Sequence, residues 1–149
     1  RQILGVFSDR LTETLAYVLG NLGAEDAMVV HGEDGLDEIT ICDGTRISRY
    51  RNGRVDTYYI TPEDFGFQKA DIKSIAGGGK KENANITLSI LNGERGPKRD
   101  IVIMNSASAI LVSGITSDLK VAKEIAEESI DSKKAVKKLK EIIEITNKL

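Results

Sequence analysis

The first third of the chain alternates short apolar runs with one amphipathic segment. The apolar residues 3–7 predict a strand, and Ser8 is placed to cap a following helix. Apolar side chains then recur at helical spacing until Gly23, at Leu11, Leu15, Val18, Leu19 and Leu22. A second apolar run covers residues 27–30. Strand, helix and strand in this order predict a parallel pair with a right-handed crossover, and ligands of such sheets collect beyond the carboxyl ends of the strands.

The middle of the chain predicts an antiparallel meander. Residues 39–42, 45–51 and 54–60 are separated by Asp43-Gly44 and Asn52-Gly53, dipeptides that favour tight hairpin turns. Thr61-Pro62 then has the pattern of a helix start. The three glycines at 77–79 predict a flexible connector.

The last part of the chain predicts helices over residues 82–91, about 97–114, and 117 to the end, with a restart near Asp131-Ser132. The predicted fold class is therefore α/β: parallel strands with a crossover helix, an antiparallel meander and C-terminal helices, in one unit.

Composition narrows the function classes. The 149 residues are 40% hydrophobic and 30% charged, which excludes disorder for most of the chain. A formal charge of -2 gives no overall field for nucleic acid or an anionic membrane. No apolar run approaches the roughly 20 residues of a membrane-spanning helix. Cys42, the one cysteine, excludes an intrachain disulfide and favours a reducing, cytoplasmic location. The chain opens without Met on an apolar run, which indicates a piece of something longer.

Residues 31–38 concentrate the candidate chemistry. Four carboxylates and His31 lie within eight residues directly after an apolar strand, with Gly32 and Gly35 freeing the backbone to turn. Asp37 and Glu38 can share one ion only if the loop turns between them, because neighbouring side chains on a strand point to opposite faces. Hard carboxylate oxygens suit Mg²⁺ or Mn²⁺. The residues alone leave an ordinary acidic surface loop open as well, with His31 as a hydrogen-bonded strand end.

Two further clusters favour structural interpretations. The glycines at 77–79 precede a helix but do not form a phosphate-binding P-loop, because Ser74 and Lys81 occupy positions that need Gly and Ser or Thr. Four arginines surround the Asn52-Gly53 hairpin and favour a solvated face over a nucleic-acid contact: Arg46, Arg49, Arg51 and Arg54. With one His and one Cys, nucleophilic catalysis is not expected.

The segment 29–39, Val-Val-His-Gly-Glu-Asp-Gly-Leu-Asp-Glu-Ile, resembles the corresponding segment of anthranilate phosphoribosyltransferases. Residues 4–8, 61–66, 82–84 and 93–105, the last with Lys98-Arg99-Asp100, resemble successive landmarks of that family in the same order. The resemblance covers nearly the whole chain.

This resemblance implies a nucleoside phosphorylase/phosphoribosyltransferase-like α/β domain. It implies that Asp37 and Glu38 hold a Mg²⁺ that accompanies phosphoribosyl diphosphate, and that His31, Gly32 and Gly35 shape the loop. The implied reaction transfers the phosphoribosyl group to anthranilate, which gives N-(5-phosphoribosyl)anthranilate and diphosphate in tryptophan biosynthesis.

The resemblance also implies that residues 1–149 are the carboxyl-terminal part of one α/β domain. The family's helical domain, diphosphate-binding loop and anthranilate-contacting Arg are expected upstream of Arg1, and a homodimer is expected through that helical domain. We therefore expect no turnover by the 149 residues alone. The alternatives are a nucleoside phosphorylase-like or non-catalytic, nucleic-acid-binding relative of the same fold, or a structural fragment without activity.

Overall fold

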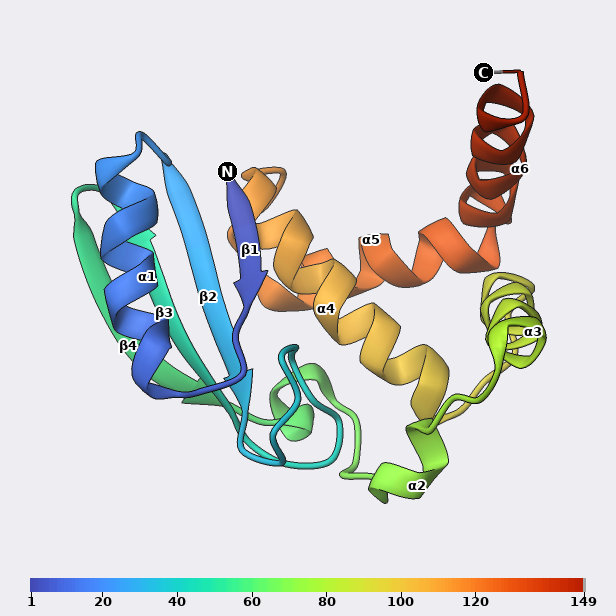
Figure 1. Ribbon diagram of the computed structural model, residues 1–149, viewed down its shortest axis with the longest axis horizontal. Helices are drawn as coiled ribbons and strands as arrows, with labels where there is room; N and C mark the ends of the chain where they lie inside the picture. Colours follow the sequence, from blue (N-terminus) through green and yellow to red (C-terminus); the bar gives the residue numbers. More distant parts are fainter. Residues whose placement is uncertain (149) are drawn as a thin grey trace.

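A four-stranded sheet has a single helix on one face and the other helices on the opposite side in the computed structural model, which describes residues 1–148 (Figure 1). The strands lie in chain order: β1 (Gln2–Gly5), β2 (Asp26–Gly32), β3 (Thr45–Arg51) and β4 (Arg54–Ile60). β1 and β2 are parallel, and the other neighbours are antiparallel. The helix α1 (Arg10–Asn21) connects β1 to β2, so the predicted strand–helix–strand unit is confirmed.

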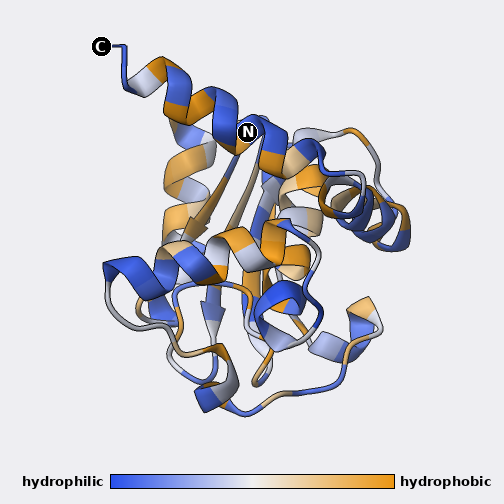
Figure 2. Ribbon diagram, turned by 90° about the vertical axis from the view of Figure 1, so that its right-hand side faces the viewer, coloured by the Kyte–Doolittle hydropathy of each residue, from blue (hydrophilic) through white to orange (hydrophobic). Residues whose placement is uncertain are grey.

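The remaining helices follow the sheet along the chain. They are the 3₁₀ turn η1 (Pro62–Phe65), α2 (Ile72–Ile75), α3 (Lys80–Leu91), α4 (Pro97–Ser113), α5 (Leu119–Asp131) and α6 (Lys134–Thr146). α4 contacts β1 and β2, α5 packs on α4, and α3 lies at the opposite end of the molecule from β4 (Figure 1). Hydrophobic and hydrophilic residues alternate along α6, none of which is buried (Figure 2). No described helix is long and apolar enough to cross a membrane.

The alternation of side chains along β2 divides the core into two parts. Met28 and Val30 belong to the larger cluster, which α4 and α5 complete. Val29 points to the other face and packs with Val6 and with Ala16 of α1. All three β2 side chains are almost fully buried, and each such burial contributes roughly 1.5–3 kcal/mol. The apolar run in the sequence is therefore continuous because helices cover both faces of the strand.

Residues 39–42 form no strand, so this part of the predicted meander is wrong. Ile39 and Ile41 are nevertheless fully buried in the larger core cluster. The amide of Ile39 donates to Asn105 Oδ1 (3.0 Å), and that of Thr40 donates to Thr45 Oγ1 (3.0 Å). Because side chains satisfy these backbone groups, the segment is buried without a β-ladder. Asp43-Gly44 accordingly makes no hairpin, whereas Asn52-Gly53 does, with φ of 53° and 79°.

Helix starts are close to the expected positions. Asp9, rather than Ser8, caps α1: its carboxylate accepts from the Arg10 amide at 2.8 Å. A carboxylate is favoured here because it also interacts with the positive end of the helix dipole. The helix start predicted at Thr61-Pro62 is confirmed. Lys133, with a φ of 65°, separates α5 from α6 close to the predicted restart at Asp131-Ser132. The short helix α2 has no counterpart in the sequence prediction.

Candidate metal-binding loop

The acidic loop follows β2 and passes against the carboxyl end of β1. A Cβ on Gly5, the last residue of β1, would collide with the backbone carbonyl of Asp37. The loop therefore lies at the end of the parallel strands, where ligands of βαβ units bind. Asp37 and Glu38 are both exposed, and neither forms an ion pair with any residue among 1–148.

The two glycines stand where the loop turns. Gly35 has a φ of +95°, which side chains with a Cβ rarely adopt, and its amide donates to the Gly32 carbonyl (2.9 Å). Gly32 in turn donates to the Leu36 carbonyl (2.8 Å). A Cβ on Gly32 would come within 2.6 Å of the Asp34 carboxylate. These contacts close a tight turn over residues 32–36, and Asp37 and Glu38 follow directly after it.

Asp34 is used within the loop. Its Oδ2 accepts from the Thr40 hydroxyl (2.5 Å), and its Oδ1 accepts from the Leu36 amide (3.2 Å). Asp34 thus stabilises the loop through Thr40 and Leu36. The carboxylates of Asp37 and Glu38 take no part in these contacts and are available to a ligand.

Charge accumulates at Glu38. Although the side chain is exposed, neighbouring atoms shield part of its carboxyl from water, which raises the pKa of Glu38 above the ordinary value, and repulsion from Asp37 and Asp34 raises that pKa further. A third negative charge is therefore disfavoured in this loop, and a bound cation would relieve the repulsion.

The donor set fits a divalent cation only in part. Within residues 1–148, no group of three or more His, Cys, Asp or Glu side chains gathers closely enough to hold a metal ion. Two carboxylates suit Mg²⁺, which commonly takes one or two protein carboxylates and fills its other positions with water and substrate phosphate. The Asp37–Glu38 pair fits Mg²⁺ on these terms, as one part of a shared site.

His31 lies apart from the Asp37–Glu38 pair. Its Nδ1 lies 2.8 Å from the Val6 carbonyl oxygen, which can only accept, so Nδ1 carries the proton. The ring joins β2 to the chain that follows β1, and lines a separate cavity of about 260 Å³ with Arg46 and Tyr59. His31 therefore acts as a structural strand end in this structure.

Asn105 of α4 is a loop contact that the sequence prediction missed. Its side-chain amide binds both backbone groups of Ile39, and its Nδ2 lies 3.5 Å from Glu38 Oε2. The available indication was a single amide within the apolar stretch 101–112 of a predicted helix.

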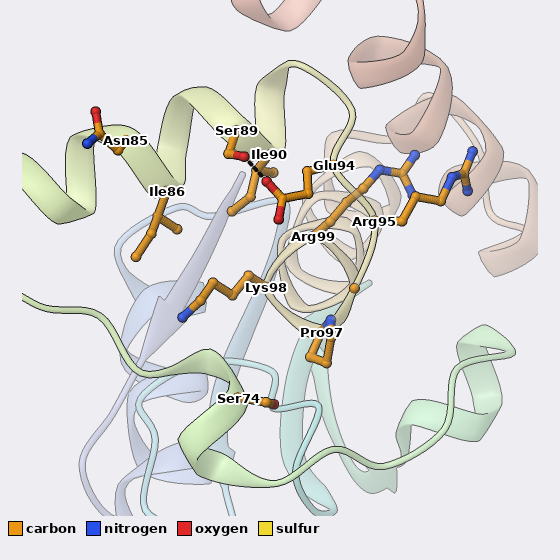
Figure 3. A pocket seen from close by; sticks show the side chains of 11 residues that line it. Ser74, Asn85, Ile86, Ser89, Ile90, Glu94, Arg95, Pro97, Lys98 and Arg99 are labelled. Carbon is orange, nitrogen blue, oxygen red and sulfur yellow. Dashed lines mark hydrogen bonds between the residues drawn. The ribbon is translucent and has the colours of Figure 1, made fainter.

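Glu38 also faces a hollow between α3 and α4. This cavity of about 280 Å³ is lined by Glu38, by Ile86 and Ile90 of α3, and by Lys98 of α4, among others. The same Ile86, Ile90 and Lys98 line a neighbouring cavity of about 360 Å³, which contains neither Asp37 nor Glu38. In that second cavity Lys98 points away from Arg95 and Arg99 (Figure 3).

Lys98, Arg99 and Asp100 lie in the first turn of α4. Arg99 is almost fully buried and donates to Asp131 of α5 (2.9 Å), and Lys98 donates to the Ala76 carbonyl. The connector at 77–79 is bound as well, because Asn83 of α3 contacts the amide (2.8 Å) and carbonyl (3.0 Å) of Gly78. These residues hold the start of α4 against α5 and the connector.

The arginine hairpin is not a free basic face. Arg49 forms two hydrogen bonds with the buried carboxylate of Asp26, at 2.8 and 2.6 Å, so the solvated face predicted for it is wrong. Arg51 also approaches Asp26 (3.5 Å), and Arg54 pairs with Asp56 (3.1 Å). Arg49, Arg51 and Arg54 thus lie against carboxylates, and Arg46 donates to Thr12 and Tyr59, so the hairpin does not favour a nucleic-acid site.

Comparison with known proteins gives a consistent assignment. A sequence family described as "Glycosyl transferase family, a/b domain" matches residues 1–136. The anthranilate phosphoribosyltransferase of Acetivibrio thermocellus is 51% identical over 146 residues, which are 98% of this chain and 42% of that protein. The enzyme of the same name from Methanobrevibacter smithii is 46% identical over 98% of this chain and 44% of its own length.

Solved structures agree. Anthranilate phosphoribosyltransferase from Saccharomyces cerevisiae in complex with PRPP and Mg superposes with a TM-score of 0.89 at 28% identity, over 100% of this chain and 43% of that one. The enzyme from Thermus thermophilus gives a TM-score of 0.80 at 34% identity, over 89% of this chain and 39% of that one. The chain thus spans less than half the length of the relatives that it matches. By its sequence over 136 of 149 residues and by its fold, the chain belongs to the glycosyl transferase family and matches the α/β domain of that family.

Proposed function

We propose that this chain supplies the Mg²⁺-binding carboxylates of an anthranilate phosphoribosyltransferase. The observation that carries the proposal is the loop at the carboxyl end of β1 and β2, where Asp37 and Glu38 are exposed and form no ion pair with any of the described residues 1–148. Relatives of this name at 46–51% identity, and a related structure in complex with PRPP and Mg, support the substrate class and the metal.

In the proposed reaction, the amine nitrogen of anthranilate forms a bond to C1 of the ribose, and the bond between C1 and the diphosphate oxygen breaks. The nitrogen then releases a proton to solvent. An aniline nitrogen is neutral at pH 7 and already has its lone pair available, so Asp37 and Glu38 are not needed as bases.

The role of the pair is electrostatic and positional. Mg²⁺ bound by Asp37 and Glu38 would neutralise charge on the departing diphosphate. Asp34 fixes the loop through Thr40, and the end of β1 contacts the Asp37 backbone, so the loop that carries both carboxylates is held in place before a substrate arrives. No covalent intermediate with the protein is involved.

The proposal includes a division of the site along the sequence. The residues that contact diphosphate and anthranilate belong, by resemblance, to the segment upstream of this chain in its longer relatives. We therefore expect no phosphoribosyl anthranilate from the 149 residues alone.

The test is the double substitution Asp37→Asn with Glu38→Gln, in a protein that carries this chain together with the upstream half of its relatives. Turnover at limiting Mg²⁺ should fall at least about tenfold, which corresponds to about 1.4 kcal/mol in the activation free energy. Glu33→Gln, an exposed acid of the same loop, is the matched control and should leave turnover unchanged. An unaltered Mg²⁺ titration in the double variant would refute the assignment.

A further inference from the structure

We propose that Asn105 is a positioning residue for the metal-binding pair, and that it acts by holding the backbone at Ile39 immediately after Glu38. The inference rests on the proposed function of Asp37 and Glu38 and extends it to a helix that lies 66 residues further along the chain.

The side-chain amide of Asn105 replaces a strand partner for Ile39. Its Oδ1 accepts from the Ile39 amide (3.0 Å), and its Nδ2 donates to the Ile39 carbonyl (2.8 Å). The same Nδ2 donates to the Ile101 carbonyl one turn earlier in α4 (3.0 Å). Both N–H groups and the oxygen of the amide are thus engaged, so its orientation is fixed.

The part of α4 that carries Asn105 is packed into the core. Ile103, Met104 and Ala107 of α4 have no exposed surface and pack in the larger core cluster. The Ile39 side chain is fully buried in that cluster too. The backbone at Ile39 is therefore fixed from two sides, by its own side chain and by the amide of Asn105.

The backbone of Glu38 is restrained as well, because Glu38 directly precedes Ile39. Asn105 Nδ2 also lies 3.5 Å from Glu38 Oε2, but both of its N–H groups are already donated to backbone carbonyls, so Asn105 acts on Glu38 through the backbone. On the other side of the pair, the end of β1 supports the Asp37 carbonyl. Asn105 and β1 together define where the two carboxylates stand, and loss of either contact frees one of them.

A purely structural role makes a different prediction. If Asn105 only satisfied buried backbone groups, its loss would lower the free energy of unfolding but leave the metal affinity of the folded molecules unchanged. If it positions the pair, affinity falls in molecules that remain folded. The experiment must therefore measure metal binding separately from stability.

Two variants and one control make this separation. Asn105→Leu keeps a side chain of similar size but removes every hydrogen bond, and Asn105→Gln keeps the amide but displaces it by one methylene. Ser108→Ala is the control: Ser108 is buried on the same helix and donates only to the Met104 carbonyl (3.0 Å). Chemical denaturation curves of all these proteins identify conditions under which each is fully folded, and the measurements below are made under those conditions.

The first measurement is amide hydrogen exchange of the 149-residue chain. The Ile39 amide should exchange at least tenfold faster in Asn105→Leu than in wild type, while the amides of the β2–β3 ladder keep their protection. Unchanged protection of Ile39 would overturn the inference.

The second measurement is Mn²⁺ binding by electron paramagnetic resonance, with Mg²⁺ as competitor, in the protein that also carries the upstream half. Asn105→Leu and Asn105→Gln should each weaken Mn²⁺ binding at least fivefold, and Ser108→Ala should not. Wild-type Mn²⁺ affinity in Asn105→Leu would overturn the inference and leave the proposed function intact. Wild-type affinity in the Asp37→Asn, Glu38→Gln protein would instead refute the proposed function, and with it the inference.

Discussion

A Cβ placed on Gly5 would lie 1.6 Å from the backbone oxygen of Asp37. The end of β1 and the acidic loop are therefore in direct backbone contact, which only glycine permits. The φ of Gly5 is not in the left-handed region, so the requirement is one of space rather than of backbone conformation.

Gly5→Ala should displace the loop and destabilise the fold by about 1–3 kcal/mol, the usual cost of overpacking a site that cannot expand. Urea denaturation measures the stability. The Mg²⁺ dependence of turnover, in the protein that also carries the upstream half, reports the displacement of the loop. Gly79→Ala is the control, since no atom of the described residues 1–148 lies within 4 Å of its added Cβ and its φ of -71° suits alanine. Equal stability of the two variants would contradict the steric explanation.

Gly35 should be sensitive for a different reason. A Cβ there meets no atom within 4 Å in the part of the chain that the structure describes, but the φ of +95° is unfavourable for residues other than glycine. Gly35→Ala should cost about 1–2 kcal/mol, and Gly35→Asn less, because asparagine tolerates positive φ better. Thermal melting of the two variants tests this order, and a smaller loss for alanine than for asparagine would reject it.

Asp26 anchors the start of β2 to β3. It is 2% exposed and accepts two hydrogen bonds from Arg49, so Asp26→Ala leaves a guanidinium without its partner. We expect a loss of about 3 kcal/mol in the free energy of unfolding. Asp56→Ala breaks the exposed pair with Arg54 and should cost less than about 1 kcal/mol. Similar urea midpoints for the two variants would show that burial does not strengthen the Asp26 pair.

Asp100 should make stability depend on pH. Burial is the main cause that raises the pKa of its carboxyl above the ordinary 3.8, so the folded protein binds this proton more tightly than the unfolded chain does. The favourable contribution is complete below pH 3.8 and is lost as the pH rises through the raised pKa of the folded state.

Asp100→Asn should therefore melt at a higher temperature than wild type at pH 7, and this difference should disappear by about pH 3. Calorimetry at both pH values makes the comparison, with Glu124→Gln as an exposed control on α5. A gain that persists unchanged at pH 3 would show that the carboxylate charge is not its cause.

Local patterns in the sequence were sufficient for much of the fold. The spacing of apolar residues predicted the β1–α1–β2 unit, because each element buries one or two faces with a fixed period. Asn52-Gly53 predicted its hairpin because both residues adopt positive φ. The acidic loop could be found because its carboxylates and glycines are adjacent in the chain.

Residues 39–42 show what the local pattern could not decide. Their alternating apolar side chains predicted a strand, but their hydrogen-bond partners include Asn105, which is 66 residues away from Ile39. Arg49 was likewise placed on a solvated face, although its partner Asp26 lies 23 residues earlier. A hydrogen-bond partner so far away in the chain produces no local sequence pattern from which the contact could be predicted.

The sequence by itself therefore determined the chemistry, a pair of carboxylates after a buried strand, and the elements on either side. The tertiary structure decided how that pair is held, through the backbone of β1 at Gly5 and the amide of Asn105 on α4. The physical reason is that residue type and period report which groups must be buried or charged. Only packing brings together the distant groups that satisfy them.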